Sequence, residues 1–176
     1  MSNIKKIVVI GPESTGKSTL SAALAKELGT VWVPEYAREY LEHLGRTYEQ
    51  QDLLEIAKGQ LELEDKLETK ANKLLVCDTD LHVIKVWSNA RYGTCNRFII
   101  ENIATRRYDM YLLTNIDTIW EDDPLREHPL PEERRYFYSI YRDIVQNSGL
   151  PWADISGTHE ERLKKALTAI QEHILS

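Results

Sequence analysis

A glycine-rich segment near the N-terminus constrains the fold of this chain more than any other part of the sequence. Residues 11–18 read GPESTGKS and fit the pattern G-x-x-x-x-G-K-[ST], with an apolar run before them and helix-forming residues after them. Gly11 and Gly16 can adopt backbone angles closed to other residues, so the N–H groups of the loop can converge on phosphate oxygens. Lys17 is placed to reach the β- and γ-phosphates and Ser18 to offer its hydroxyl to Mg²⁺. The segment therefore predicts a nucleotide-binding phosphate loop made of Gly11, Pro12, Glu13, Ser14, Thr15, Gly16, Lys17, Ser18 and Thr19.

Strand-like and helix-like segments alternate along the rest of the chain. Short apolar runs predict strands at residues 4–10, 31–33, 74–77, 110–113 and 152–155. Helix formers and capping signals predict helices at residues 18–28, 47–72, 81–90, 96–104, 131–149 and 158–176. Thr47 with Gln50, and Thr158 with Glu161, resemble capping boxes that open two of these helices. Strands separated by helices predict an α/β fold whose parallel sheet is covered on both faces and binds ligands beyond the carboxyl ends of its strands.

The composition is that of one ordinary domain. A chain of 176 residues, 42% of them hydrophobic, is expected to form a single domain over residues 1–176. Its formal net charge of −6 disfavours broad binding to nucleic acid, which usually needs a basic excess. The first apolar run is too short for a signal peptide or a membrane span. Cys77 and Cys95 match no metal or redox spacing, so we expect a cytoplasmic location, and nothing in the sequence indicates an oligomeric state.

Acidic residues follow two of the predicted strands. Asp78 ends the third strand beside the phosphate loop, where a carboxylate can hold the metal ion of a nucleotide site. Asp80 is a second candidate, and either residue could instead belong to a turn. Glu35 follows the second strand, where it could take the proton of a substrate hydroxyl or bind ribose hydroxyls. Arg38 would share the face of Glu35 at a helix start, and the two could equally form an exposed ion pair.

The stretch from residue 115 to residue 131 holds three prolines and many charges, so we predict a loop. Trp120 lies in it and is costly to leave unpacked. Arg126, Arg134 and Arg135 bring guanidinium groups near one another; Arg134 should point inward and Arg135 should be solvated. Because phosphoryl transfer needs a cation above the transferring group, Arg126 is a candidate catalytic residue. The alternative is a solvated, charged hairpin with Trp120 against the core.

A guanine-nucleotide switch is the less favoured interpretation of the same phosphate loop. Residues 114–117 are partly similar to the guanine-reading motif N-K-x-D but lack its lysine. Residues 78–81 lack the glycine that senses the γ-phosphate in such switches. We therefore expect Asp117 to be a surface loop residue or a helix cap.

Four motifs in this order resemble the nicotinamide riboside kinase domain of the NadR family, grouped with the AAA_28-type P-loop proteins. They are the phosphate loop, residues 35–39 (EYARE), residues 78–80 (DTD) and residues 120–126 (W-x-D-D-x-L-R), and the resemblance extends to about Arg162. It implies a kinase-type P-loop NTPase with sheet order 2-3-1-4-5, a lid over residues 116–135 and an adenine-side loop near Ser156 and Gly157. It also implies ATP- and Mg²⁺-dependent phosphorylation of the 5′-hydroxyl of nicotinamide riboside to nicotinamide mononucleotide, a step of NAD biosynthesis.

Taken with the motifs, the resemblance assigns roles to individual residues. The expected catalytic residues are Lys17, Glu35, Asp78 and Arg126, with Ser18 and Asp78 holding Mg²⁺. The expected substrate-binding residues are Glu35, Tyr36, Arg38, Asp80, Trp120 and Asp123. NadR proteins also carry an adenylyltransferase domain, so we expect this chain to be a stand-alone kinase. In that family the position before the glutamate can be an aromatic residue that stacks on the nicotinamide ring; here it is Pro34, with Trp32 on the same side of the strand.

The sequence leaves three functional alternatives open. The first is a kinase for nicotinamide riboside, and the second is a kinase of the same fold for another nucleoside or nucleotide. The third is a regulatory ATPase module that binds nucleotide without a small-molecule acceptor. Glu35 and Arg126 favour the kinases, because a pure switch needs neither an acceptor base nor a lid arginine.

Overall fold

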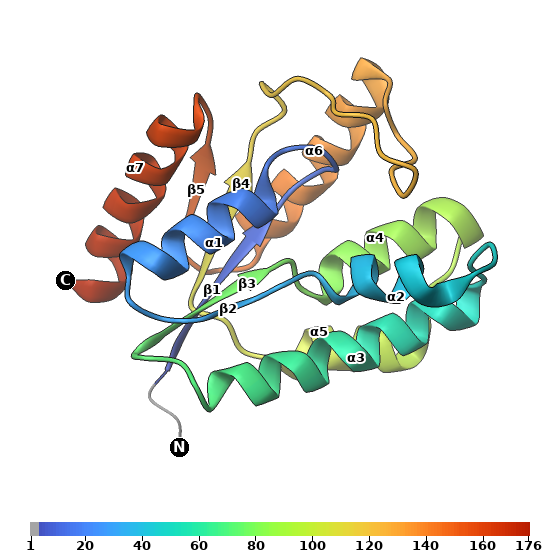
Figure 1. Ribbon diagram of the computed structural model, residues 1–176, viewed down its shortest axis with the longest axis horizontal. Helices are drawn as coiled ribbons and strands as arrows, with labels where there is room; N and C mark the ends of the chain where they lie inside the picture. Colours follow the sequence, from blue (N-terminus) through green and yellow to red (C-terminus); the bar gives the residue numbers. More distant parts are fainter. Residues whose placement is uncertain (1–3) are drawn as a thin grey trace.

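A parallel sheet of five strands forms the centre of the computed structural model, which describes residues 4–176 (Figure 1). The strands are β1 (Lys5–Ile10), β2 (Trp32–Val33), β3 (Leu74–Asp78), β4 (Met110–Thr114) and β5 (Trp152–Ile155). Their order in the sheet is β2-β3-β1-β4-β5, and every pairing is parallel. The α/β class and the 2-3-1-4-5 order are therefore confirmed. This order puts the end of β1 between the ends of β3 and β4, so the loops that follow these three strands meet above the same edge.

Helices cover both faces of the sheet because successive residues of β1 are apolar on both sides. Ile7 and Val9 face a core with α1 (Lys17–Glu27) and α7 (His159–Ile170). Val8 and Ile10 face a core with α3 (Gln50–Glu68), α4 (Leu81–Tyr92) and α6 (Pro131–Asn147). A further apolar cluster joins α3 and α4 to α2 (Tyr36–Leu44) and α5 (Arg97–Thr105) at one side of the sheet. The chain ends in the short η1 (Gln171–Leu175) after α7.

The start of α3 differs from the predicted capping box. The helix begins at Gln50 rather than Thr47, because the buried Asp52 carboxylate accepts the Glu49 backbone N–H at 2.7 Å and completes a capping box with Glu49. Arg46 donates to the same carboxylate at 2.8 and 2.9 Å, which holds the turn before the helix. The helix also ends at Glu68, earlier than the predicted residue 72. The box of Thr158 and Glu161 at α7 is confirmed.

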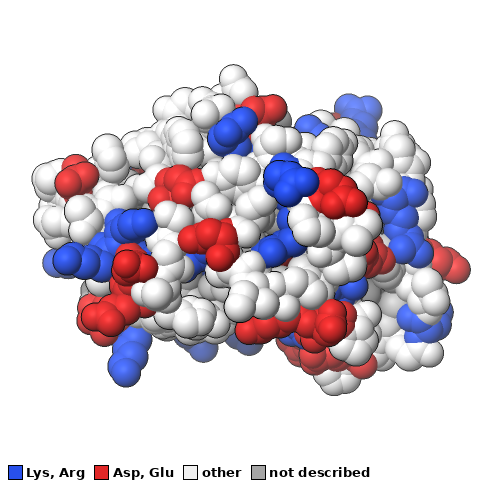
Figure 2. All heavy atoms as spheres, turned by 90° about the horizontal axis from the view of Figure 1, so that it is seen from above, with Lys and Arg blue, Asp and Glu red and all other residues white. Residues whose placement is uncertain are grey.

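The surface above the sheet carries both signs of charge. Figure 2 looks down on the molecule from the top of Figure 1 and shows basic and acidic side chains interspersed rather than gathered by sign. No helix between Ile4 and Ser176 combines the length and apolar character needed to cross a bilayer.

Candidate active site

The glycine-rich segment forms a compact loop between β1 and α1, as predicted. Gly11 has a φ of 155°, and a Cβ there would lie 2.8 Å from the Thr114 carbonyl oxygen, so no larger residue fits against β4. Gly16 adopts a φ of 76° immediately before α1. The Thr15 hydroxyl closes the loop by donating to the Pro12 carbonyl at 2.7 Å. The loop backbone is thus fixed by its glycines and by its contact with β4.

Lys17, Ser18 and Asp78 meet at the foot of this loop. Lys17 Nζ donates to the Pro12 carbonyl at 2.8 Å, and Ser18 Oγ donates to Asp78 Oδ2 at 2.5 Å. Asp78 is fully buried, and its Oδ1 has no hydrogen-bond partner among residues 4–176. Burial, helped by the negative charge of Glu35, raises the pKa of Asp78 to about 7.

This donor set fits a magnesium ion. A buried carboxylate with one free oxygen, next to a serine hydroxyl, offers the hard oxygen ligands that Mg²⁺ takes from proteins, with substrate phosphates and water supplying the rest. No cluster of three His, Cys, Asp or Glu side chains able to hold a metal by itself occurs among the described residues. The site is therefore of the kind that a nucleotide completes.

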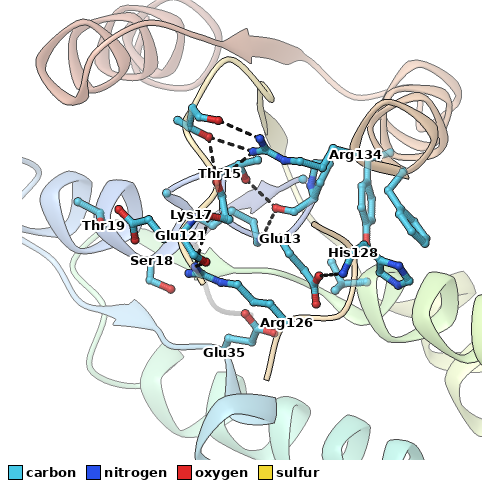
Figure 3. A pocket seen from close by; sticks show the side chains of 18 of the residues that line it. Glu13, Thr15, Lys17, Ser18, Thr19, Glu35, Glu121, Arg126, His128 and Arg134 are labelled. Carbon is cyan, nitrogen blue, oxygen red and sulfur yellow. Dashed lines mark hydrogen bonds between the residues drawn. The ribbon is translucent and has the colours of Figure 1, made fainter. Parts of the chain in front are cut away.

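A cavity of about 730 Å³ opens above the carboxyl ends of the strands, and Lys17, Ser18, Glu35 and Arg126 all line it (Figure 3). We call its two sides the phosphate-loop half and the helix half. The phosphate-loop half is lined by residues 11–19 and by Asp117, Thr118, Ile119, Gly157, Thr158, His159, Glu161 and Arg162. The helix half is lined by Glu35, Ala37, Arg38, Leu41, Val83, Val86, Trp87, Phe137 and Tyr141. Glu121, Leu125, Arg126, Glu127, His128 and Arg134 line the cavity from the 115–130 loop and the start of α6.

The helix half combines one carboxylate with an apolar wall. Glu35 stands between β2 and α2 and is the N-terminal cap residue of α2. Val83, Val86 and Trp87 recur at helical spacing on α4, and Phe137 and Tyr141 come from α6. A flat apolar group with a hydroxyl directed toward Glu35 would suit this surface.

Two carboxylates of the 115–130 loop form ion pairs with arginines of α2 and α4. Arg38 Nη2 donates to Asp123 Oδ2 at 2.9 Å, and Arg91 Nη1 donates to Glu127 Oε1 at 2.9 Å. The Leu125 backbone N–H, together with the Arg38 guanidinium, lowers the pKa of Asp123, so this carboxylate stays charged. Neither arginine presents an uncompensated positive charge to the cavity.

The 115–130 loop is attached to the phosphate loop by several hydrogen bonds. Ser14 is the centre of these contacts: its hydroxyl accepts from the Glu121 N–H at 2.9 Å and from Arg126 Nη1 at 3.3 Å. Its carbonyl accepts from Arg134 Nη2 at 3.2 Å. The guanidinium groups of Arg126 and Arg134 lie 5.9 and 5.8 Å from the Trp120 ring. Arg134 is buried as predicted, whereas the exposed Arg135 stays outside the group.

Arg162 joins the far end of the phosphate-loop half. It is 3% exposed and donates to the carbonyls of Thr15, Asn115 and Gly157 and to the Asp117 carboxylate. Asp117 also accepts the Gly157 N–H at 2.7 Å. Asp117 is an exposed loop residue, as predicted, but it caps no helix; it lines the cavity and binds the loop after β5.

The structure brings most of the predicted site residues together but leaves some outside the cavity. Among the described residues that line it, Tyr36, Asp78, Asp80, Trp120, Asp123 and Ser156 do not appear. Asp78 contacts the phosphate loop through the Ser18 hydroxyl. Asp80 caps α4 and accepts hydrogen bonds from His82 and from Tyr111. Ser156 accepts from Lys165. These side chains act on the cavity only through their neighbours.

Sequence reasoning missed the apolar wall and Arg162. Val83, Val86 and Trp87 follow the i, i+3, i+4 pattern that also marks a buried core face, so periodicity alone does not separate the two. Arg162 lies one residue after the capping box of α7, and nothing in its local sequence indicates that it reaches the phosphate loop. Both depend on how distant segments pack.

The sheet order, with a phosphate loop after the central strand, defines the fold of the P-loop kinases. Thymidylate kinase from Candida albicans shares it with a TM-score of 0.68 at 14% identity, covering 96% of this chain and 92% of that chain. The chain belongs to the AAA_28 family, described as an AAA domain, whose model matches residues 6–162.

Relatives of the NadR type match over nearly the whole chain. The trifunctional NAD biosynthesis/regulator proteins NadR of Salmonella typhimurium and Escherichia coli K12 are each 25% identical to it over 174 residues. The match covers 96% of this chain and 42% of each relative, so the chain spans less than half the length of these curated relatives. A solved structure of a NadR protein in complex with NR has a TM-score of 0.82 at 24% identity, covering 98% of this chain and 52% of that chain. The resemblance to the NadR family is confirmed.

Proposed function

We propose that this chain is an ATP- and Mg²⁺-dependent kinase that phosphorylates the 5′-hydroxyl of nicotinamide riboside in cytoplasmic NAD salvage. The observation that carries the proposal is a cavity in which the phosphate loop faces Glu35 and an apolar wall. A nucleotide in one half and a nucleoside in the other would place a hydroxyl beside the transferring phosphoryl group. The NadR relatives, and a solved structure of a NadR protein in complex with NR, support this choice of acceptor.

The phosphate-loop half would bind ATP. The loop N–H groups and the N-terminus of α1 favour anionic phosphate oxygens, and Lys17 would leave the Pro12 carbonyl for the β- and γ-phosphates. Ser18 and Asp78 would hold Mg²⁺, which neutralises charge on the phosphates when bound. Arg126 would turn from Ser14 toward the transferring group, where negative charge develops.

Glu35 would orient the acceptor hydroxyl and take its proton late in the transfer. It lies at the carboxyl edge of the sheet, across the cavity from the phosphate loop. A carboxylate in this position can serve as the acceptor base of phosphoryl transfer. The segment 116–135 would act as the lid over both ligands in a single kinase domain.

The charges of the helix half favour a nucleoside over a nucleotide as the acceptor. An acceptor that already carries a phosphate needs an uncompensated cation to bind that phosphate. Arg38 is the one cationic residue among the described residues that line this half, and it is paired with Asp123. Arg91, which is not part of the lining, is paired with Glu127, and Glu35 adds a negative charge. This balance suits a neutral or cationic ring system and disfavours a second phosphate, which argues against an acceptor like that of thymidylate kinase.

The test is an acceptor screen with the purified chain, ATP and MgCl₂. Nicotinamide riboside should be phosphorylated, and Glu35→Gln should lower kcat by about a hundredfold, because the amide keeps the shape but cannot take the proton. Glu101→Gln, which removes an exposed ion pair on α5, is the matched control and should behave as the wild type. Turnover of another nucleoside but not of nicotinamide riboside would identify a kinase with a different acceptor. ATP hydrolysis that no acceptor stimulates would identify a regulatory ATPase instead.

A further inference from the structure

Glu127 in the 115–130 loop contacts structures on both sides of the cavity. Its backbone N–H and that of His128 each donate to Glu13 Oε2 of the phosphate loop at 3.1 Å (Figure 3 shows Glu13 and His128). Its carboxylate Oε1 accepts from the Tyr48 hydroxyl at 2.8 Å and from Arg91 Nη1 at 2.9 Å. Tyr48 precedes α3 and Arg91 lies on α4, so one residue joins the phosphate loop to α4 and to the segment before α3.

The Tyr48 hydroxyl carries this link to the cavity wall. Trp87 Nε1 donates to the Tyr48 oxygen at 2.7 Å, so the phenol accepts from Trp87 and its own proton points to Glu127. Burial and the hydrogen bond to Glu127 raise the pKa of Tyr48 far above its usual value, and the phenol stays protonated. The rings of Tyr48 and Trp87 also pack edge to face with centroids 4.8 Å apart. Glu127 is therefore connected to the Trp87 side chain through the Tyr48 hydroxyl.

We propose that Glu127 is a positioning residue that makes binding at the phosphate loop and binding against Trp87 depend on each other. The inference rests on the proposed function, because it takes the nucleotide to bind at the phosphate loop and the acceptor against α4. Nucleotide phosphates compete with Pro12 and Ser14 for the donors Lys17 and Arg126, and Glu13 lies between those two acceptors. A change in the position of the phosphate loop is transmitted from Glu13 to Glu127 through the backbone N–H groups of Glu127 and His128. It is transmitted from Glu127 to Trp87 through the Tyr48 hydroxyl. By linkage, an acceptor that orders Trp87 tightens nucleotide binding by the same factor.

The hydrogen bond to Tyr48, rather than the ion pair, carries the link. The side chains of Arg91 and Glu127 are 38% and 31% exposed, and ion pairs of that kind contribute little. Glu127→Gln keeps an oxygen for the Tyr48 hydroxyl and removes only the charge. Glu127→Ala and Tyr48→Phe each break the hydrogen-bonded path to Trp87.

The experiment uses the full chain labelled with 5-fluorotryptophan and titrated with AMP-PNP and MgCl₂. The ¹⁹F resonance of Trp87 is assigned by its loss in Trp87→Phe, and those of Trp120 and Trp152 likewise. Trp120 lies beside Arg126 and reports that the nucleotide is bound, whereas Trp152 at the start of β5 is the internal reference. In the wild type, in Glu127→Gln and in the control Glu101→Gln, the Trp87 resonance should shift with the nucleotide. In Glu127→Ala and Tyr48→Phe, Trp120 should still respond and Trp87 should not.

A second measurement compares the Kd of AMP-PNP with and without saturating nicotinamide riboside. The Kd should fall at least about fivefold in the wild type and in Glu127→Gln, and by less than about twofold in Glu127→Ala. A Trp87 shift that is the same in Glu127→Ala as in the wild type would overturn the inference, and so would a Trp87 resonance that never responds while Trp120 does. A protein in which Trp87 responds to nucleotide through Glu127, yet no nicotinamide riboside is phosphorylated, would overturn the proposed acceptor and leave this link in place.

Discussion

Asp78 is a carboxylate whose surroundings oppose its charge. It is fully buried, faces the negative charge of Glu35, and has one oxygen without a partner among the described residues. Asp78 lies at the end of a buried strand beside Ser18, where a cation can bind. The burial and the free oxygen that oppose the charge of the carboxylate therefore favour the binding of Mg²⁺ together with nucleotide. Function and stability are thus in conflict at this residue.

This conflict predicts a pH dependence of stability. The pKa of Asp78 is about 7 in the folded protein and 3.8 in an unperturbed carboxyl, so its contribution favours folding below pH 4 and is lost as the pH rises through 7. Without Mg²⁺, the unfolding free energy of the wild type should fall between pH 4 and 8 relative to Asp78→Asn, on the order of 2–4 kcal/mol. Urea denaturation at several pH values measures the difference. Parallel curves for the two proteins would show that the carboxyl stays charged.

Arg126 offers a second prediction at the residue scale. Its guanidinium lies within 3.3 Å of the Ser14 hydroxyl and lines the cavity, so a small rotation would bring it to a transferring phosphoryl group. Arg126→Ala should lower kcat by about a hundredfold and change the KM for ATP by less than about fivefold, because the charge it meets develops only in the transition state. Steady-state kinetics separate the two constants. A raised KM with unchanged kcat would make Arg126 a ground-state binding residue.

At the scale of elements, the contact between α2 and α3 depends on one glycine. Gly59 lies inside α3, and a Cβ there would penetrate the ring of Tyr36 at the start of α2. Tyr36 is also held by its N–H, which donates to Gln60 at 2.8 Å. Because Glu35 directly precedes this residue, the fit of the two helices sets the position of the proposed acceptor base.

Gly59→Ala should therefore destabilise the fold although alanine is the better helix former. The gain in helix propensity is at most about 1 kcal/mol, whereas overpacking against a held ring costs about 1–3 kcal/mol. The acceptor KM should rise while the KM for ATP stays close to the wild-type value. In a double-mutant cycle, Tyr36→Ala should remove most of the cost of Gly59→Ala. An unchanged midpoint of urea denaturation in Gly59→Ala alone would contradict this account.

The elements were largely predictable because their signals are local. The β-branched runs, the phosphate-loop pattern and the box of Thr158 with Glu161 each depend on a few neighbouring residues. The start of α3 was missed because Asp52 receives its donors from Arg46 and Tyr40 through tertiary packing, which outweighs the weaker signal at Thr47. The phosphate-loop half of the cavity could be predicted from one motif, whereas the wall at Trp87 depends on the packing of α4 with α2 and α3.

At the scale of the molecule, Arg162 ties together three segments that are far apart in the sequence. Its guanidinium binds Thr15 of the phosphate loop, Asn115 and Asp117 after β4, and Gly157 after β5. The side chain is buried, so removing it leaves several acceptors without a donor. The edge of the sheet that would hold the nucleotide is organised from this one position.

Arg162→Ala should destabilise the protein by about 3 kcal/mol, since removing one partner of a buried, charged hydrogen-bond network usually costs this much. The KM for ATP should rise more than the KM for the nucleoside. The reason is that the carbonyl and carboxylate oxygens that bind the Arg162 guanidinium all belong to the phosphate-loop half of the cavity. Arg162→Lys keeps the charge but not the fork of donors and should recover only part of the stability. Denaturation midpoints and the two KM values test this, and equal effects on both substrates would count against it.

The two halves of the cavity come from separate stretches of chain. The phosphate-loop half comes from residues 11–19, the loops after β4 and β5 and the start of α7, and the helix half comes from α2, α4 and α6. Proteins with this scaffold can therefore differ in the acceptor that they phosphorylate while keeping the same ATP site. The same division makes the molecule suitable for chimeras. Exchanging residues 35–44, 81–92 and 137–147 for the corresponding segments of another kinase of this fold should transfer the acceptor preference without redesigning the nucleotide site.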